Sequence, residues 1–109
     1  MNEPFIQVGI LLEKPAITFS LLSDYRLSDD LVKAGSYSVE WSEGKILFRD
    51  RRYDEIVFQP ADPHKNAFEL KDVIIGVDFH WERKEDQRFL GGLKFIVEND
   101  AVTAINIVA

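Results

Sequence analysis

Three residues of this sequence have the types and the spacing of a metal-binding set. Asp78, His80 and Glu82 alternate with apolar residues, so on a β-strand their side chains would project from one face. An imidazole flanked by two carboxylates is a ligand set that a zinc ion accepts. A strand with one buried face routinely produces such a polar row on its other face, and a solvated face is therefore the simpler interpretation. We predict no metal ion and no cofactor for this chain, with a zinc site at these three residues as the alternative.

The sequence contains no recognisable catalytic motif. A GxSxG nucleophile segment, a glycine-rich phosphate loop and an HExxH pair are all missing. Because the chain has no cysteine, thiol nucleophiles, thiolate metal sites and disulfides are excluded together. Glycoside cleavage needs a carboxyl group with a raised pKa in a cleft, and the sequence singles out none of its 19 acidic residues for that role. We predict no catalytic residue in this chain.

Aromatic residues offer a different chemistry, because sugar rings stack on aromatic rings exposed on a β-surface. Trp41 and Trp81 share a strand face with neighbouring valines, which favours packing in the core. Tyr25 and Tyr53 lie at the edges of predicted loops and are freer to contact a ligand. The sequence thus indicates Tyr25, Tyr53 and Trp81 as candidate sugar-stacking residues, with core packing as the alternative for the tryptophan.

Length and charge narrow the class of protein. With 109 residues, the chain is long enough for one domain with a single core. Its net charge of −6 repels phosphate backbones and anionic headgroups, so we predict no nucleic-acid partner and no binding to membrane surfaces. No apolar run approaches the roughly 20 residues of a membrane-spanning helix, and the first residues lack the basic start of a signal peptide. We expect one β-rich domain over residues 1–109, with no membrane insertion and with its compartment left open.

Alternation of apolar and polar residues along most of the chain indicates β-strands. Residues 89–97 and Ala101–Val108 alternate in this way on either side of an Asn-Asp pair. Residues 36–49 show the same alternation around a Glu-Gly pair. Both segments have the signature of a β-hairpin.

The remaining segments are assigned from the same pattern. Residues 6–12 are predicted to form a strand that pairs with residues 17–21, and further strands are predicted over residues 54–59, 68–70 and 73–81. Residues 23–35 are predicted to form a loop with at most one short helical turn at residues 31–33, and residues 60–66 and 82–88 are predicted to be connections. No segment shows helical periodicity. The predicted fold class is therefore all-β with at most one short helix, as a small β-sandwich or a partly open β-barrel of antiparallel hairpins.

The last hairpin resembles the beginning of the SpoIID/LytB domain, which is found in stage II sporulation protein D and in amidase enhancers. That family has an aromatic-Arg-Gly step, an apolar strand, a turn and a strand that ends near Val-Asn. In this chain FLGGL, residues 89–93, stands at the first step, and AINIVA, residues 104–109, stands at the last. Leu90 occupies the position of the usual arginine. The amino-terminal IQVGILLE is also similar to the family's first strand.

This resemblance implies a role in the processing of peptidoglycan. SpoIID-type proteins cleave glycan strands as lytic transglycosylases, and the LytB type is described as enhancing an amidase. The family's catalytic glutamate lies beyond the matched segment, after an Asp-Tyr-Leu sequence. The resemblance therefore implies a non-catalytic amino-terminal domain of a longer, exported cell-envelope protein, which supports the catalytic half or binds peptidoglycan glycan strands or a cell-wall amidase.

Two further expectations concern function and assembly. The alternative function is that of a self-contained β-sandwich that binds a protein or a carbohydrate. If a catalytic half follows this chain, the strand Ala101–Val108 is expected to be an exposed edge. Self-association by strand addition at that edge is then expected.

Overall fold

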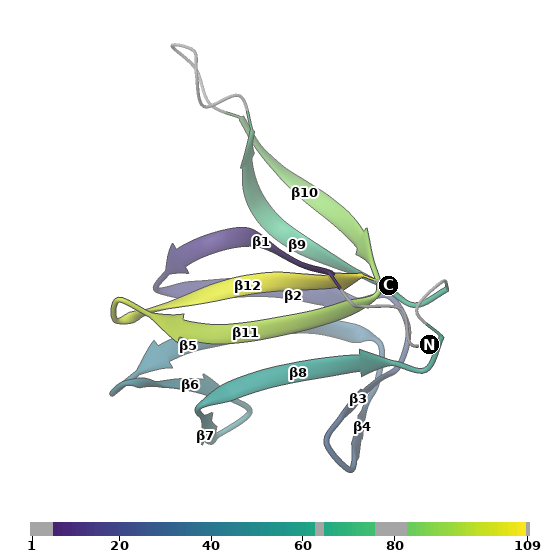
Figure 1. Ribbon diagram of the computed structural model, residues 1–109, viewed down its shortest axis with the longest axis horizontal. Coiled ribbons are helices and arrows are strands. Elements are labelled where there is room, and N and C mark those ends of the chain that lie inside the picture. The colour runs from purple at the N-terminus through teal and green to yellow at the C-terminus, as the bar shows by residue number, and fades with distance from the viewer. Residues whose placement is uncertain (1–5, 63–64, 76–82, 109) are drawn as a thin grey trace.

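The chain folds into two antiparallel β-sheets that pack face to face (Figure 1). The computed structural model describes residues 6–62, 65–75 and 83–108. Within these residues there are twelve strands, six in each sheet, and no helix. The two sheets do not close into a barrel. The predicted all-β class is confirmed, and of the two architectures considered the sandwich is the one found.

Each sheet has a strand order that differs from the order of the strands along the chain. The first sheet consists, from edge to edge, of β1 (Ile6–Lys14), β12 (Ala101–Val108), β11 (Gly92–Glu98), β8 (Glu55–Pro60), β3 (Tyr25–Leu27) and β4 (Asp30–Val32). The second sheet consists of β10 (Arg83–Leu90), β9 (Ala67–Ile75), β2 (Ala16–Leu21), β5 (Gly35–Ser42), β6 (Lys45–Phe48) and β7 (Arg51–Tyr53). Among the described strands, β1 and β4 are the edges of the first sheet, and β10 and β7 are the edges of the second.

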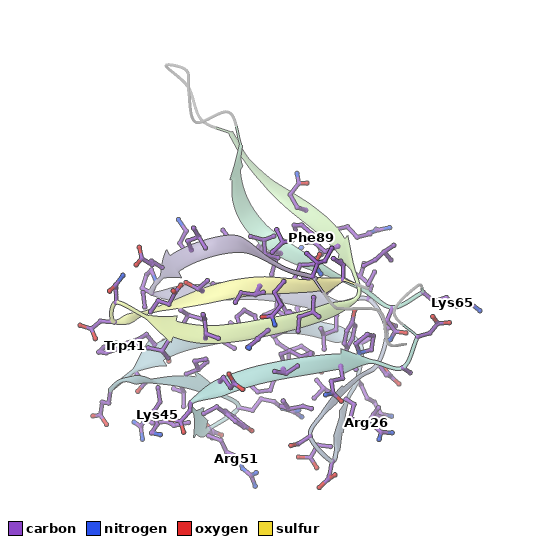
Figure 2. The ribbon with its side chains drawn as sticks, viewed as in Figure 1. Arg26, Trp41, Lys45, Arg51, Lys65 and Phe89 are labelled. Atoms are coloured by element: carbon purple, nitrogen blue, oxygen red, sulfur yellow. The ribbon has the colours of Figure 1, made fainter. Side chains whose placement is uncertain are left out.

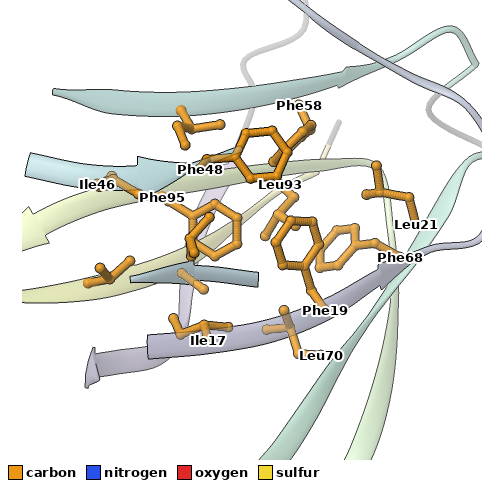
Figure 3. Close-up of a cluster of buried hydrophobic side chains, with 14 of the residues drawn as sticks. Ile17, Phe19, Leu21, Ile46, Phe48, Phe58, Phe68, Leu70, Leu93 and Phe95 are labelled. Carbon is orange, nitrogen blue, oxygen red and sulfur yellow. The ribbon is translucent and has the colours of Figure 1, made fainter. Parts of the chain in front are cut away.

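Alternate residues of the two sheets meet in an aromatic core (Figure 3). The ring of Phe19 on β2 lies 5.1 Å from that of Phe95 on β11 and 5.5 Å from that of Phe58 on β8, between centroids. Phe48 on β6 meets Phe58 edge to face at 5.6 Å. Burial of one such side chain stabilises a fold by about 1.5–3 kcal/mol, and a favourable ring pair adds about 0.5–1.5 kcal/mol. This cluster is the main contact between the two sheets.

Two-residue turns close three of the hairpins. Glu43-Gly44, Arg49-Asp50 and Asn99-Asp100 each have positive φ at both residues. A two-residue turn with positive φ at both positions twists in the same sense as the strands that it joins, and this conformation favours Gly, Asn and Asp. The hairpins predicted around the Glu-Gly and Asn-Asp pairs are confirmed, as β5–β6 and β11–β12. The third hairpin joins β6 to β7.

The predicted pairing of the first two strands is wrong. β1 pairs with β12 in the first sheet, whereas β2 pairs with β5 and β9 in the second. The Lys14-Pro15 break that ends β1 is the place where the chain changes sheets. Register shifts along β1 also bury Leu11 and leave Leu12 exposed, against the simple alternation of the sequence.

Residues 23–35 contain a hairpin where a loop with a short helical turn was predicted. β3 pairs antiparallel with β4, and β3 also pairs with β8. Tyr25 and Leu27 of β3 and Val32 of β4 are buried in the core. Strands of three residues carry too little alternation to be predicted from sequence, and it is burial against the other sheet that stabilises them.

The charged segment predicted to be a connection is strand β10. It pairs antiparallel with β9 from Arg83 opposite Ile75 to Leu90 opposite Ala67. Figure 1 shows this hairpin extending away from the rest of the sandwich. Main-chain hydrogen bonds to β9 hold this strand, and they form whatever the side chains are. Because the segment is mostly charged, it lacks the apolar alternation from which a strand is predicted. The predicted loop over residues 60–66 is confirmed from residue 61 onward in its described part, whereas Pro60 is the last residue of β8; β9 begins at Ala67.

Gly91 divides the predicted strand over residues 89–97 into two. β10 ends at Leu90 in the second sheet and β11 begins at Gly92 in the first. Gly91 has φ of 96°, and a Cβ atom there would lie 2.4 Å from the carbonyl oxygen of Ile107. Only glycine fits both the conformation and the space, so this residue sets the point where the chain crosses between sheets.

The prediction that Ala101–Val108 forms an exposed edge is wrong. β12 pairs with β1 on one side and with β11 on the other. Its main-chain groups are already used on both sides, so the strand offers no open ladder for strand addition.

Candidate binding groove

A groove opens at the edge of the sandwich where β4 ends the first sheet and β7 ends the second. Two adjoining hollows share four lining residues, which are Leu27, Asp30, Arg51 and Tyr53. The first also touches Leu31, Val32, Phe48 and Arg49, and the second touches Ser28, Glu55, Val57 and Gln59. We call this combined surface the β4–β7 groove. The first hollow has about 280 Å³, near the lower end of the range of small-ligand sites and sufficient for a ring-sized group.

Tyr53 is the aromatic residue that lines both hollows of the groove. It is the last residue of β7, is half-buried, and packs against the core with its ring 6.5 Å from that of Phe48. Its hydroxyl forms no hydrogen bond with another residue of the described part of the chain. The ring is thus held by the protein on one side while its hydroxyl is available to a ligand. This agrees with its predicted role as a sugar-stacking residue, a role that itself stays a prediction.

Arg49 borders the groove at the β6–β7 turn. Its guanidinium carbon lies 5.7 Å from the ring centroid of Tyr37 and 5.6 Å from that of Phe48. Attraction between the cation and these two rings holds the side chain in position. Within the described residues it has no carboxylate partner. Its hydrogen-bonding capacity therefore stays available although its position is fixed.

The side chain of Arg51 also has no ion-pair or hydrogen-bond partner among the described residues. Figure 2 shows it at the lower edge of the molecule, with its side chain reaching outward from β7. The neighbouring Arg52 differs, because its guanidinium lies 3.7 Å from the carboxylate of Glu43 and its Nε donates a hydrogen bond to Ser42. Arg49 and Arg51 thus bring two unpaired cations to one groove.

Acidic and amide groups complete the lining. Asp30 borders both hollows, and Glu55 and Gln59 border the second. Glu55 lies 3.7 Å from Lys94, so its charge is partly compensated. The carboxylate of Asp30 can accept hydrogen bonds from hydroxyl groups. The groove therefore combines an aromatic surface, hydrogen-bond acceptors and free guanidinium groups.

Tyr25, the second predicted sugar-stacking residue, is not available to a ligand, and that prediction is wrong. Its side chain is fully buried and its hydroxyl donates a 2.7 Å hydrogen bond to the carbonyl oxygen of Gly91. Burial raises the pKa of this hydroxyl. The side chain amide of Asn106 donates to the carbonyls on either side of Gly91, those of Leu90 at 2.9 Å and Gly92 at 3.1 Å.

Asn66 completes this network. Its carbonyl accepts a 3.1 Å hydrogen bond from the Gly91 N–H, and its side chain amide donates to the carbonyl of Asp24 at 2.9 Å. We call Tyr25, Asn66, Gly91 and Asn106 the polar corner. Their polar groups are bonded to the protein itself, so the corner fixes the crossing between the sheets and is not a ligand site.

Trp81, the third predicted sugar-stacking residue, lies outside the described residues. The zinc alternative at Asp78, His80 and Glu82 also lies outside them. Among the residues that the structure does describe, no group of three His, Asp or Glu could hold a metal ion. Trp41 packs against the core, as its parity with Val39 predicts, and its indole N–H has no partner there.

Sequence reasoning missed the two arginines of the groove. The run Arg49-Asp50-Arg51-Arg52 is typical of a solvated turn, and only the sheet order places it beside β4, some twenty residues earlier in the chain. A local signal did exist, since an Arg-Asp pair between two alternating segments is compatible with a tight hairpin turn. Leu31 was missed because its segment was interpreted as helical, and it is 59% exposed at the groove.

The described part of the chain has no helix able to cross a membrane. Comparison with models of protein families, with curated proteins and with solved structures found no match to this chain. The candidate site therefore has to be judged from its own geometry.

Proposed function

We propose that this chain is a non-catalytic, glycan-binding β-domain of a SpoIID/LytB-like peptidoglycan-processing protein. The observation that carries the proposal is the β4–β7 groove, in which Tyr53, packed against the core, lines a ring-sized hollow bordered by polar side chains. The similarity of the last hairpin and the first strand to the SpoIID/LytB domain supports the family assignment. Catalysis is assigned to the half of such proteins that follows the matched segment.

The chemistry of the groove supports binding in preference to turnover. A glycosidase or a lytic transglycosylase needs a carboxyl group that is kept protonated by burial or by a neighbouring charge. Asp30 and Glu55, the two carboxylates of the groove, are both exposed to solvent. A stacking ring beside exposed hydrogen-bonding groups is suited to holding a sugar, and it offers no acid for cleaving one.

Titration with short peptidoglycan glycan strands, free of peptides, tests the proposal. Amide chemical shifts measured by NMR should change at β4, at β7 and in the β6–β7 turn, and the fitted Kd should rise at least fivefold in Tyr53→Ala. Tyr53→Phe keeps the ring and should bind within about twofold of the wild type. Leu12→Ala truncates an exposed apolar side chain of β1 that lies outside the groove, and it serves as the control. Shift changes confined to other strands, or equal binding by Tyr53→Ala, would end the proposal.

The second candidate is a self-contained β-sandwich that binds a carbohydrate or a protein. The closed aromatic core between the two sheets favours it, because the described strands already cover one another's apolar faces. Glycan binding in the groove fits both candidates. The gene that encodes this chain decides between them: an Asp-Tyr-Leu segment with a following glutamate beyond Ala109 supports the SpoIID/LytB assignment, and a continuation without them supports the second candidate.

A further inference from the structure

We propose that the β4–β7 groove selects saccharides that carry a carboxylate, and that Arg51 and Arg49 bind that carboxylate. This inference rests on the proposed glycan binding and goes further, because it names the acidic group of the ligand and the residues that recognise it. A stacking tyrosine by itself would accept neutral and acidic sugars alike.

The first support is that both guanidinium groups are unpaired. Neither forms an ion pair with another described residue, although the chain carries six more acidic than basic residues. Some cations of the molecule pair, as Lys45 does with Asp54, whereas others, such as Arg26, are also without an ion pair among the described residues. Arg49 and Arg51 differ from Arg26 because both line the same hollow. Unpaired donors at a groove match an anionic ligand, because a guanidinium forms its strongest hydrogen bonds with carboxylates and phosphates.

The second support is the geometry around Arg49. Its guanidinium lies over the rings of Tyr37 and Phe48, and the residue also lines the first hollow together with Arg51 and Tyr53. A cation that is already fixed loses little conformational entropy when it binds a ligand. The aromatic surface and the positive charge thus lie on the same side of the sandwich, within reach of a single sugar and its substituent.

The acidic residues of the groove favour a ligand with a single negative charge over a polyanion. Asp30 and Glu55 would repel the successive phosphates of a nucleic acid, as would the net charge of −6. A sugar acid brings one carboxylate for the arginines and several hydroxyl groups, which can donate hydrogen bonds to Asp30 and Gln59. This combination of one anion with many donors matches the lining residues.

Three ligands with the same glycan backbone test the inference. The first is a tetrasaccharide of alternating N-acetylglucosamine and N-acetylmuramic acid, which bears lactyl carboxylates. The second is its carboxyl methyl ester, and the third is chitotetraose, which lacks the lactyl groups. NMR titration of the whole chain should give a Kd for the acidic tetrasaccharide that is roughly five- to tenfold lower than for either neutral ligand, as a solvent-accessible charge-assisted hydrogen bond allows.

Variants assign that preference to the groove. Arg51→Gln and Arg49→Gln should each reduce it to about twofold or less, and Arg51→Lys should keep part of it because the charge remains. Arg26→Gln removes an exposed arginine of β3 that does not line the groove, and it should leave the preference unchanged. The preference should also weaken between low salt and about 0.5 M salt, since screening reduces exposed charge interactions.

The outcomes separate the two proposals. Equal binding of all three ligands with shifts at Tyr53 would overturn the carboxylate inference and leave glycan binding intact. No binding of any ligand would overturn both. A preference for the acid that survives in Arg51→Gln and in Arg49→Gln would also overturn the assignment to these residues.

Discussion

The polar corner and the β4–β7 groove each contain a tyrosine among other polar side chains, and they differ in whether those polar groups are bonded within the protein. In the corner, the hydroxyl of Tyr25 and the amides of Asn66 and Asn106 are bonded to main-chain groups of the protein. In the groove, the hydroxyl of Tyr53 and the guanidinium of Arg51 have no partner among the described residues. A satisfied and buried polar group stabilises the fold, and an unsatisfied group at a groove remains available to a ligand.

The comparison predicts that substitutions in the corner lower stability, whereas loss of an unsatisfied polar group in the groove leaves stability almost unchanged. The largest effect is expected at Gly91. In Gly91→Ala the new methyl group would meet the carbonyl oxygen of Ile107 at 2.4 Å, in a backbone conformation with φ of 96°. Strain and overpacking together should lower the free energy of unfolding by about 3–5 kcal/mol, measured by urea denaturation.

A second glycine provides the matched control for this prediction. Gly44 also has positive φ, of 83°, but a Cβ atom there would meet nothing within 4 Å. Gly44→Ala should therefore lose only about 1 kcal/mol, from backbone conformation alone. Similar losses in the two variants would show that the crossing between the sheets does not depend on the close approach at Gly91.

Asn106 is expected to give the next largest effect. In Asn106→Asp the shape is kept, but a carboxylate replaces the amide that donates to the carbonyls of Leu90 and Gly92. Placing a negative charge against two carbonyl oxygens at a buried position should lower stability by about 2–4 kcal/mol at pH 7. A loss under about 1 kcal/mol in thermal and urea unfolding would argue that the amide is not required at the corner.

Tyr25 should give a smaller loss and a pH dependence. Tyr25→Phe removes the 2.7 Å hydrogen bond to Gly91 and should lower stability by about 1–2 kcal/mol. Burial raises the pKa of this hydroxyl above its ordinary value of 10.0, so the folded state holds the proton more tightly than the unfolded state. The stability that this difference provides is complete below pH 10 and is lost as the pH rises toward the folded-state pKa, by up to about 1.4 kcal/mol per pH unit.

The measurement is urea unfolding of the wild type and of Tyr25→Phe at a series of pH values up to about 11, beyond the ordinary pKa of a tyrosine. The wild type should lose stability more steeply than the variant above that pKa. Parallel curves would mean that another tyrosine, or general alkaline unfolding, accounts for the decline.

The smallest stability effect is expected in the groove. Tyr53→Phe removes a hydroxyl that has no partner in the described part of the chain, so the free energy of unfolding should change by less than about 0.5 kcal/mol. Thermal unfolding of this variant beside Tyr25→Phe compares the same chemical change in the two regions. A loss at Tyr53 as large as that at Tyr25 would remove the distinction between them.

The fold class could be predicted from sequence because its signals are local. Alternation and two-residue turns lie within single hairpins, and both predicted hairpins are found. The pairing of β1 with β12 and of β3 with β8 could not be predicted, because it joins residues far apart in the chain. β10 pairs with the preceding strand and was missed because its charged sequence lacks alternation. Tyr25 and Tyr53 both lie at the edges of predicted loops, so the sequence does not distinguish them. In the structure Tyr25 is buried against the turn at Gly91, whereas the order of the sheets leaves Tyr53 accessible at the groove.

The lining of the groove was also beyond prediction for a physical reason. Arg49 and Arg51 become neighbours of Asp30 and Leu31 only when both sheets are complete and their edges lie on the same side. A run of charges with no partner in sequence is ordinarily a solvated turn. The tight β6–β7 turn instead directs one arginine onto aromatic rings and places Arg51 on an edge strand.

The edge strands β4 and β7 have three residues each, and each pairs with a single neighbour. A ligand that contacts Leu31 on β4 and Tyr53 on β7 would connect the two sheets through their short edge strands. Because it would bind only while both strands are in place, its binding energy would resist their fraying. Amide hydrogens of these two short strands would then exchange with solvent more slowly, while those of the distant β9–β10 arm would exchange as before.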